Sequence, residues 1–223
     1  WDRSAGNGSE LGLHATELGD AVHRLLERVD LARPAVPGDL RDLVPAWYPA
    51  ASESEVRQIE RHVCAYCDST LAARIAGLDG VRVERPFAFE VDDVLLNGRL
   101  DVLWRSGLEA LVLDYKTNLM DGRAPAAVVE DEYRLQRIVY ALACFRAGAD
   151  DVEVVYQFLE SPEAIVSERF SGIDVERLER ELGVAIARIR EGDFRPTPSA
   201  FACAGCPALD RVCGGPGLAL VDV

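Results

Sequence analysis

Along this chain the spacing of apolar residues changes twice, from a helical period to a strand period and back. Between Leu18 and Val29, apolar residues recur every three or four positions, which predicts a half-buried helix. This apolar face consists of Leu18, Val22, Leu25, Leu26 and Val29. The next segment, Leu31 to Pro49, contains four prolines and interrupts both periods, so we expect an ordered surface connection there.

A second helix is expected to begin after Ser52, whose side chain can cap it. Glu53 and Glu55 fall in its first turn, where the helix dipole favours negative charge. The helical period continues to about Ala76, and Gly77 ends it.

Three runs rich in branched and aromatic residues come next, which predicts a meander of three strands. These runs are Val81–Val91, Val94–Arg105 and Ala110–Lys116, with turns at 92–93 and 106–107. A long helix is then expected over Pro125–Ala147, with a buried stripe formed by Leu135, Ile138, Val139 and Leu142. Two further strands, Glu153–Leu159 and Ile165–Phe170, precede a last helix over Asp174–Glu191, which Asp174 can cap.

The element order and the size of the chain predict one α/β domain. Its 223 residues are 49% hydrophobic, which is enough for a sizeable core. We expect the single domain to span 1–223, with the core over 18–195 and a tail rich in Cys, Pro and Gly over 196–223. Because the chain begins at Trp1 and its only methionine is Met120, we expect it to be a piece of a larger protein.

The charge and the cysteines restrict the partners and the compartment. A net charge of −14 is unfavourable for a protein that coats DNA alone, because such affinity comes from basic side chains that displace counterions. No apolar run approaches the roughly 18 residues that a membrane span needs, so no membrane partner is expected. Six cysteines spread through a domain without a secretion signal favour the cytoplasm.

The third strand ends in acid and lysine side chains that can carry chemistry. The strand period places Val112, Asp114 and Lys116 on one face, with Asp114 and Lys116 roughly 6.5 to 7 Å apart. If the preceding strand pairs with this one, Asp101 lies near Asp114 across the ladder. Two close carboxylates repel unless a cation intervenes, and hard oxygen ligands suit Mg²⁺ or Mn²⁺. An Asp-x-Lys tripeptide by itself, however, is often only a surface ion pair.

Four motifs in order resemble the RecB-like branch of the PD-(D/E)XK nuclease superfamily. They are Leu18–His23 (LGDAVH), Gly98–Asp101 (GRLD), Asp114–Thr117 (DYKT) and Tyr133–Tyr140 (YRLQRIVY). The resemblance covers about Leu18 to Val155 and is strongest to the nuclease domains of helicase-nucleases of the RecB and AddA kind. It implies a restriction-endonuclease-like fold, with a central mixed sheet of about five strands flanked by helices.

The resemblance also assigns roles to individual residues. It implies that His23, Asp101 and Asp114 bind the metal together with the main-chain carbonyl of Tyr115. Lys116 would be the catalytic lysine. Leu100 stands where the superfamily name has a proline, which leaves Asp101 unaffected.

The same motifs suggest substrate contacts. Gln136 and Tyr140, one helical turn apart, would position the substrate strand, and the substrate-binding candidates also include Arg137 and Thr117. A solvated helix face is the alternative for Arg137. Glu84 resembles a recurrent family position, although a charge close to a proline can simply mark a strand edge.

The tail contains a possible metal site of its own. Cys203, Cys206 and Cys213 have the spacing C-x₂-C-x₆-C, which can hold Zn²⁺ or, with a fourth cysteine, a [4Fe-4S] cluster. Cys64 and Cys67 form another C-x₂-C inside the second predicted helix, where this spacing is typical of two small core residues.

These observations predict a Mg²⁺- or Mn²⁺-dependent DNA nuclease, in particular an exonuclease. We expect a fused or partner helicase to deliver the DNA during double-strand break repair and recombination. Two alternatives stay open, namely a catalytically silent domain that binds DNA ends and a free-standing iron-sulfur exonuclease. The presence of Asp101, Asp114 and Lys116 together favours the enzyme.

Overall fold

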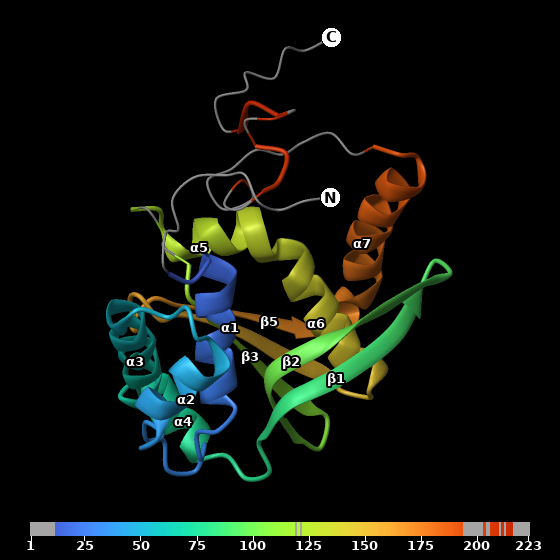
Figure 1. Ribbon diagram of the computed structural model, residues 1–223. Coiled ribbons are helices and arrows are strands. Elements are labelled where there is room, and N and C mark those ends of the chain that lie inside the picture. Colours follow the sequence, from blue (N-terminus) through green and yellow to red (C-terminus); the bar gives the residue numbers. More distant parts are fainter. Residues whose placement is uncertain are drawn as a thin grey trace.

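The computed structural model describes residues 12–118, 120, 122–193, 203, 206–209, 211 and 213–215 of the chain. Its centre is a five-stranded sheet whose strands follow one another in chain order (Figure 1). The strands are β1 (Arg82–Val91), β2 (Val94–Ser106), β3 (Glu109–Lys116), β4 (Asp151–Phe158) and β5 (Ile165–Ser171). Only β3 and β4 pair in parallel, and the other neighbours are antiparallel. The predicted mixed sheet of five strands flanked by helices is therefore confirmed.

Helices cover both faces of the sheet (Figure 1). The first four are α1 (Ala15–Leu26), α2 (Leu40–Trp47), α3 (Glu53–Cys67) and α4 (Thr70–Ala76). The connection from β3 to β4 contains α5 (Pro125–Val128), the π-helix η1 (Val129–Tyr133) and α6 (Arg134–Arg146). After β5 come the 3₁₀ helix η2 (Gly172–Asp174) and α7 (Val175–Arg190). No helix in the described part of the chain has the length and apolar character that a membrane crossing requires.

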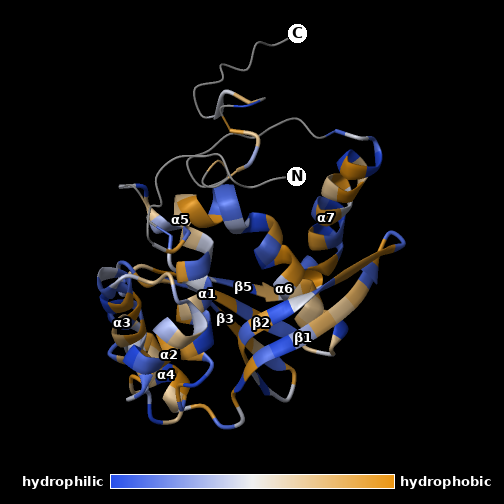
Figure 2. Cartoon of the chain, viewed as in Figure 1, coloured by the Kyte–Doolittle hydropathy of each residue, from blue (hydrophilic) through white to orange (hydrophobic). Residues whose placement is uncertain are grey.

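Two hydrophobic clusters lie on opposite faces of the sheet. On β3, Val112 belongs to the cluster under α6 and α7, whereas Leu111 and Leu113 belong to the cluster under α1 to α4. The strand period therefore directs Asp114 and Lys116 toward α6. Figure 2 shows hydrophobic (orange) and hydrophilic (blue) residues interspersed along the helices, as expected for helices with one buried and one exposed side.

The hairpin of β1 and β2 changes faces halfway along its length. Val83 and Phe87 are four residues apart and would share a face in a regular strand. Instead, Val83 packs against the cluster under α1 to α4 and Phe87 against the cluster under α6. Between them, Glu84 has a positive φ of 50°, which is uncommon outside glycine. The switch occurs between the pairs Val83–Val102 and Arg85–Leu100, so Glu84 and Asp101 both lie at an irregular point of the hairpin.

Two predictions for the N-terminal helices were wrong. The helix that begins after Ser52 stops at Cys67, because the hydroxyl of Ser69 accepts the Ala72 N–H at 3.0 Å and starts α4 as a separate helix. The predicted connection over 31–49 contains α2, even though Pro45 lies inside this helix. Burial of Leu40 and Val44 in the core outweighs the hydrogen bond lost at the proline.

The helix predicted over 125–147 is also not uniform. Its π-helical segment holds more residues per turn than an α-helix and so rotates the residues that follow. Leu135, predicted to be buried, is 41% exposed, whereas Ile138 and Leu142 are buried as predicted. Asp174 does not cap α7 with its side chain, because its carboxylate accepts the backbone N–H of Ser171 and pairs with Arg177.

Candidate active site

Asp114 and Lys116 lie side by side at the end of β3, facing α6. The Lys116 ammonium is 2.6 Å from Oδ1 of Asp114. Asp114 is only 2% exposed, so its charge is largely removed from water. Burial and the nearby charge of Asp101 raise the pKa of Asp114 above its usual value, and Lys116 opposes this shift. The pair is therefore a buried ion pair rather than a surface one.

Two residues of α6 complete a polar ring with this ion pair. The Lys116 ammonium donates to Oε1 of Gln136 at 2.9 Å, and the Gln136 amide donates to the Tyr140 hydroxyl at 2.8 Å. The Tyr140 hydroxyl in turn donates to Oδ2 of Asp114 at 2.9 Å. Each group therefore restrains the next. The position of the Lys116 ammonium is fixed by α6 as well as by β3.

Two aromatic rings lie close to the ammonium. Nζ of Lys116 is 4.0 Å from the ring centre of Tyr133 and 5.4 Å from that of Tyr156. The two rings stack on each other, with centres 5.8 Å apart. Tyr133 is the last residue of the π-helix, and its hydroxyl donates to Asn118. Cation–π attraction thus helps to localise the charge of Lys116.

Asp101 and His23 lie beside β3 from the two neighbouring elements, β2 and α1. Oδ2 of Asp101 accepts the backbone N–H of Tyr115 at 3.0 Å and is 3.3 Å from Nδ1 of His23. Nε2 of His23 is 3.1 Å from the Tyr115 carbonyl oxygen. Burial lowers the pKa of His23, but the hydrogen bond and charge of Asp101 and the charge of Asp114 outweigh it and raise this pKa to about 9.

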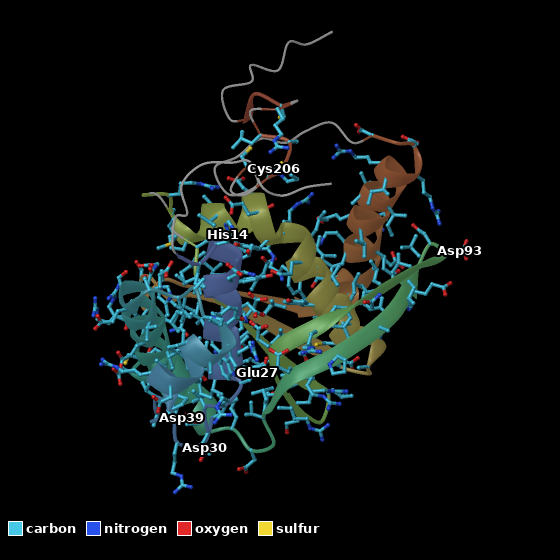
Figure 3. All side chains as sticks on the ribbon, in the orientation of Figure 1. His14, Glu27, Asp30, Asp39, Asp93 and Cys206 are labelled. Carbon is cyan, nitrogen blue, oxygen red and sulfur yellow. The ribbon has the colours of Figure 1, made fainter. Side chains whose placement is uncertain are left out.

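Close packing around α1 leaves little room beside this histidine. Gly19, one turn before His23, faces Thr117, and a Cβ at Gly19 would be 3.1 Å from the Thr117 hydroxyl. Figure 3 labels His14 just before α1 and Glu27 just after it, which marks the two ends of this helix. The histidine therefore lies in the last turn of α1, directly against the end of β3.

Glu84 is the third acid of this region. Ligand atoms of His23, Glu84 and Asp101 all lie within 4.8 Å of one another. Burial raises the pKa of Glu84, a hydrogen bond from Arg99 opposes the shift, and the charges of Glu27 and Asp101 add to it. A small hollow lined in part by these residues opens between α1 and β1. An imidazole and two carboxylates at this spacing form a donor set that fits a divalent cation.

The structure thus brings most of the predicted site residues together, in two adjoining groups. Asp101 and His23 join Glu84, while the Asp114 carboxylate is turned toward Lys116 and Tyr140. The main-chain carbonyl of Tyr115 faces His23. Glu84, which sequence reasoning gave an uncertain role, belongs to the more compact group.

Arg137 and the tail cysteines are not part of these groups. The guanidinium of Arg137 pairs with Glu130 at 2.8 Å and with Glu168 at 2.9 Å. Among the described residues, the one cluster with metal-ligand spacing is the group of His23, Glu84 and Asp101. Cys203, Cys206 and Cys213 do not form such a cluster, so the structure does not support the zinc or iron-sulfur prediction.

Sequence reasoning missed two features of the site. Tyr156 was read only as a strand residue, although its ring packs beside Lys116. The positive φ of Glu84 has no signal in the sequence, because glycine or asparagine would be the usual residue there. One signal was available, since Lys116 is the only lysine among the 223 residues and every other basic side chain with a permanent charge is arginine.

Comparisons with known proteins bear on the family to which the chain belongs. The sequence model of the PD-(D/E)XK nuclease superfamily matches residues 4–214. Similar proteins include an ATP-dependent helicase/nuclease subunit from Bacillus cereus (strain AH187), 24% identical over 156 residues that cover 59% of this chain and 12% of that protein. The protein of the same name from Listeria monocytogenes serotype 4b (strain F2365) is 25% identical over 167 residues, which cover 66% of this chain and 14% of that protein.

The structural comparison is more distant. A crystal structure of a candidate exonuclease from Eubacterium rectale aligns with a TM-score of 0.49 and 13% identity, over 86% of this chain and 72% of that one. The chain spans about one eighth of the length of the helicase/nuclease proteins that it matches. The family match, by contrast, extends over nearly the whole sequence, and the mixed five-stranded sheet between two helical layers agrees with it. The chain belongs to the PD-(D/E)XK nuclease superfamily and has its restriction-endonuclease-like fold.

Proposed function

We propose that this domain is a divalent-metal-dependent deoxyribonuclease that acts as the exonuclease part of a helicase-nuclease of the AddA kind. The observation that carries this proposal is the polar ring of Asp114, Lys116, Gln136 and Tyr140 next to Asp101 and His23. A structural ion pair would not need a buried acid beside a second acid, because each raises the cost of ionising the other. Functional sites hold charges in such arrangements.

A divalent cation fits the donor groups on both sides of Tyr115. His23 would supply an imidazole nitrogen, Asp101 and Asp114 would supply carboxylate oxygens, and Tyr115 would supply its main-chain carbonyl. Glu84 is a further carboxylate ligand within reach of His23 and Asp101. Oxygen-rich sets of this kind suit Mg²⁺ or Mn²⁺. When bound, the metal would supply acidified water and a positive charge at the scissile phosphate.

The chain's own residues would then orient the substrate and stabilise developing charge. The Lys116 ammonium can neutralise negative charge that grows on the phosphoryl oxygens, since it is a compact donor already fixed in place. Gln136 and Tyr140 hold this ammonium and the Asp114 carboxylate at their present separation. Thr117, the residue that follows Lys116, is proposed to contact the substrate strand.

The biological setting follows from similarity and charge. The matched relatives are named as helicase/nuclease subunits, and this chain corresponds to a small part of each. An acidic domain gains little affinity from counterion release, but a tethered motor would raise the local concentration of the strand without a basic surface. We therefore propose that a fused or partner helicase delivers DNA to this domain during double-strand break repair and recombination.

A cleavage assay tests the nuclease proposal. The purified protein should shorten linear DNA in the presence of Mg²⁺ or Mn²⁺ and should be inactive in EDTA. Asp114→Asn and Lys116→Met should each fold normally and lose cleavage by about 10²-fold or more. Circular single-stranded DNA should resist cutting if the enzyme requires ends. A wild-type protein that binds DNA but never cuts it would instead support a silent end-binding domain.

A further inference from the structure

A stacked group of side chains lies on the surface immediately beside His23. Arg24 follows His23 on α1, and its guanidinium carbon is 4.2 Å from the ring centre of Trp47, the last residue of α2. The ring centre of Tyr48 is 5.8 Å from the same carbon. Asp20, one turn earlier on α1, accepts a hydrogen bond from the Tyr48 hydroxyl. We call Arg24, Trp47 and Tyr48 the stacking patch.

The stacking patch keeps a cation that lacks an acidic partner. Among the described residues, no carboxylate forms an ion pair with Arg24, whereas the neighbouring Arg28 pairs with Asp39 and Arg41 pairs with Glu60. Acidic residues outnumber basic ones in this chain, so the missing partner does not reflect a shortage of acids. Asp20, one turn earlier on the same face, accepts a hydrogen bond from the Tyr48 hydroxyl instead. The side chain of Arg24 is hydrogen-bonded to the Tyr48 hydroxyl, which is neutral, so no carboxylate neutralises the charge of Arg24.

The way in which Arg24 lies over Trp47 determines which part of the stacking patch a ligand can reach. Trp47 is half-buried and packs against the cluster under α1 to α4, so its ring has little freedom. The Arg24 guanidinium lies over this ring, while the Arg24 side chain is exposed. One face of the planar group therefore rests on tryptophan, and the exposed side chain leaves part of the group accessible. Nucleic acid bases stack on guanidinium planes held in this way, and on the aromatic rings beside them.

We propose that the stacking patch binds an unpaired base of single-stranded DNA whose neighbouring phosphate enters the site at His23. The proposal rests on the nuclease function proposed above, because it assigns to that site a contact with the flanking nucleotide. Arg24 follows His23 on α1, so the stacking patch adjoins the site. A duplex would keep its bases paired and would present only phosphates to Arg24.

A purely structural role of Arg24 and Trp47 would have different experimental consequences. If Arg24 and Trp47 only join α1 to α2, their replacement lowers stability and leaves DNA binding unchanged. Stacking makes binding depend on the presence of bases, because a strand without bases keeps its phosphates but loses its flat surfaces. An abasic strand of equal length therefore separates the two roles.

The experiment measures binding in EDTA, so that no cleavage occurs, by fluorescence anisotropy of a labelled oligothymidylate and of an abasic strand of equal length. Wild type should prefer the oligothymidylate. Arg24→Gln and Trp47→Leu should weaken oligothymidylate binding on the order of tenfold and bring it close to the abasic value. Arg41→Gln, which removes the same charge from an ion-paired surface arginine, should keep the wild-type preference.

Two results would overturn the proposal. Equal weakening of both strands in Arg24→Gln would show a phosphate contact only, and unchanged binding in both variants would show a packing role. Arg24 is exposed, so its substitution should leave the fold intact even if Trp47→Leu lowers the melting temperature. Mg²⁺-dependent cleavage by the same wild-type preparation is measured separately. Absence of cleavage would refute the nuclease proposal. The preference for the strand with bases would still show whether the stacking patch binds an unpaired base.

Discussion

The Lys116 ammonium and the Asp114 carboxylate lie 2.6 Å apart in a chain that has no other lysine. Arginine supplies every other permanent positive charge, including those of the ion pairs on the surface. A guanidinium is planar and presents donors in a fixed fork, whereas an ammonium is a compact point charge. The space between the ring of Tyr133 and the amide of Gln136 suits the ammonium of Lys116 better than a guanidinium.

Lys116→Arg should therefore fail to restore activity even though it conserves charge. We expect a loss in kcat of about 10²-fold, close to that of Lys116→Met, because the larger fork cannot occupy the same position. Single-turnover cleavage of linear DNA in Mg²⁺ measures this loss. Circular dichroism and melting curves serve as controls for folding. Wild-type cleavage by Lys116→Arg would show that charge alone suffices and that the enclosure has no catalytic role.

Metal should stabilise the protein through the acids around Tyr115. In the metal-free protein Asp114 is buried near Asp101, and each charge makes the other less favourable. A bound cation removes this repulsion. Mg²⁺ at one hundred times its Kd should raise the free energy of unfolding by about 2.7 kcal/mol. For a domain of this size, this corresponds to a rise of roughly 5 to 10 °C in melting temperature. Thermal melts with and without Mg²⁺ measure the shift.

Substitutions of the acids separate ligands from bystanders. Asp101→Asn and Asp114→Asn should each reduce the shift caused by Mg²⁺ to a small fraction of the wild-type value. Asp39→Asn, which changes an exposed aspartate paired with Arg28, should retain the full shift. If all three variants respond to Mg²⁺ like wild type, the ion binds elsewhere and the proposed ligand set is wrong.

The sequence predicted the part of the site that depends on regular strand geometry. Because β3 is a regular strand, the two-residue period correctly placed Asp114 and Lys116 on one face with Val112. The paired strand β2 likewise brought Asp101 to the backbone of Tyr115. Element types were predictable where the periodic pattern was long, as on α1 and α7.

The remaining features depend on irregular backbone, which the side-chain pattern does not encode. The positive φ of Glu84 moves β1 from one face of the sheet to the other, and the local sequence has no glycine to indicate it. The π-helix before α6 inserts extra backbone that brings Tyr133 to Lys116 and turns Leu135 to solvent. Both irregularities concern residues of the site, where packing against a particular neighbour outweighs local propensity.

The hydrogen bond from Tyr140 to Asp114 should contribute to turnover more than to substrate binding. Tyr140→Phe keeps the ring and removes only the hydroxyl that joins Gln136 to the Asp114 carboxylate. Loss of one hydrogen bond to a charged group costs about 1.5 to 3 kcal/mol, so kcat should fall roughly 10- to 100-fold. KM should change by less than about threefold. Steady-state cleavage of a defined oligonucleotide gives both values.

Tyr66→Phe is the matched control for this substitution. Tyr66 is fully buried on α3, in the cluster on the opposite side of the sheet, where its ring packs against the side chain of Tyr115 and not against the polar ring around Lys116. We expect wild-type kcat and KM from this variant. Equal losses in the two variants would mean that Tyr140→Phe acts through general destabilisation and not through Asp114.

Glu153, which lies outside the proposed active site, should make the free energy of unfolding depend on pH. This β4 residue is 9% exposed, and its carboxylate accepts two hydrogen bonds from Arg74 on α4, at 2.8 and 2.7 Å. Ser167 and Arg169 on β5 donate further hydrogen bonds. The Arg74 hydrogen bonds, opposed by burial and assisted by Ser167 and Arg169, lower the pKa of Glu153 from 4.5 to about 2.

A depressed carboxyl pKa stabilises the folded protein at pH values above the unfolded pKa. The contribution of Glu153, about 3 kcal/mol, should therefore be complete above pH 4.5 and disappear as the pH falls toward 2. Urea unfolding at several pH values should show Glu153→Gln less stable than wild type by about this amount at pH 7, with the difference shrinking below pH 4.5. Glu53→Gln, at a surface pair with Arg57, should cost less than about 0.5 kcal/mol at every pH. A constant difference between wild type and Glu153→Gln across this range would show that Glu153 acts through packing and not through its charge.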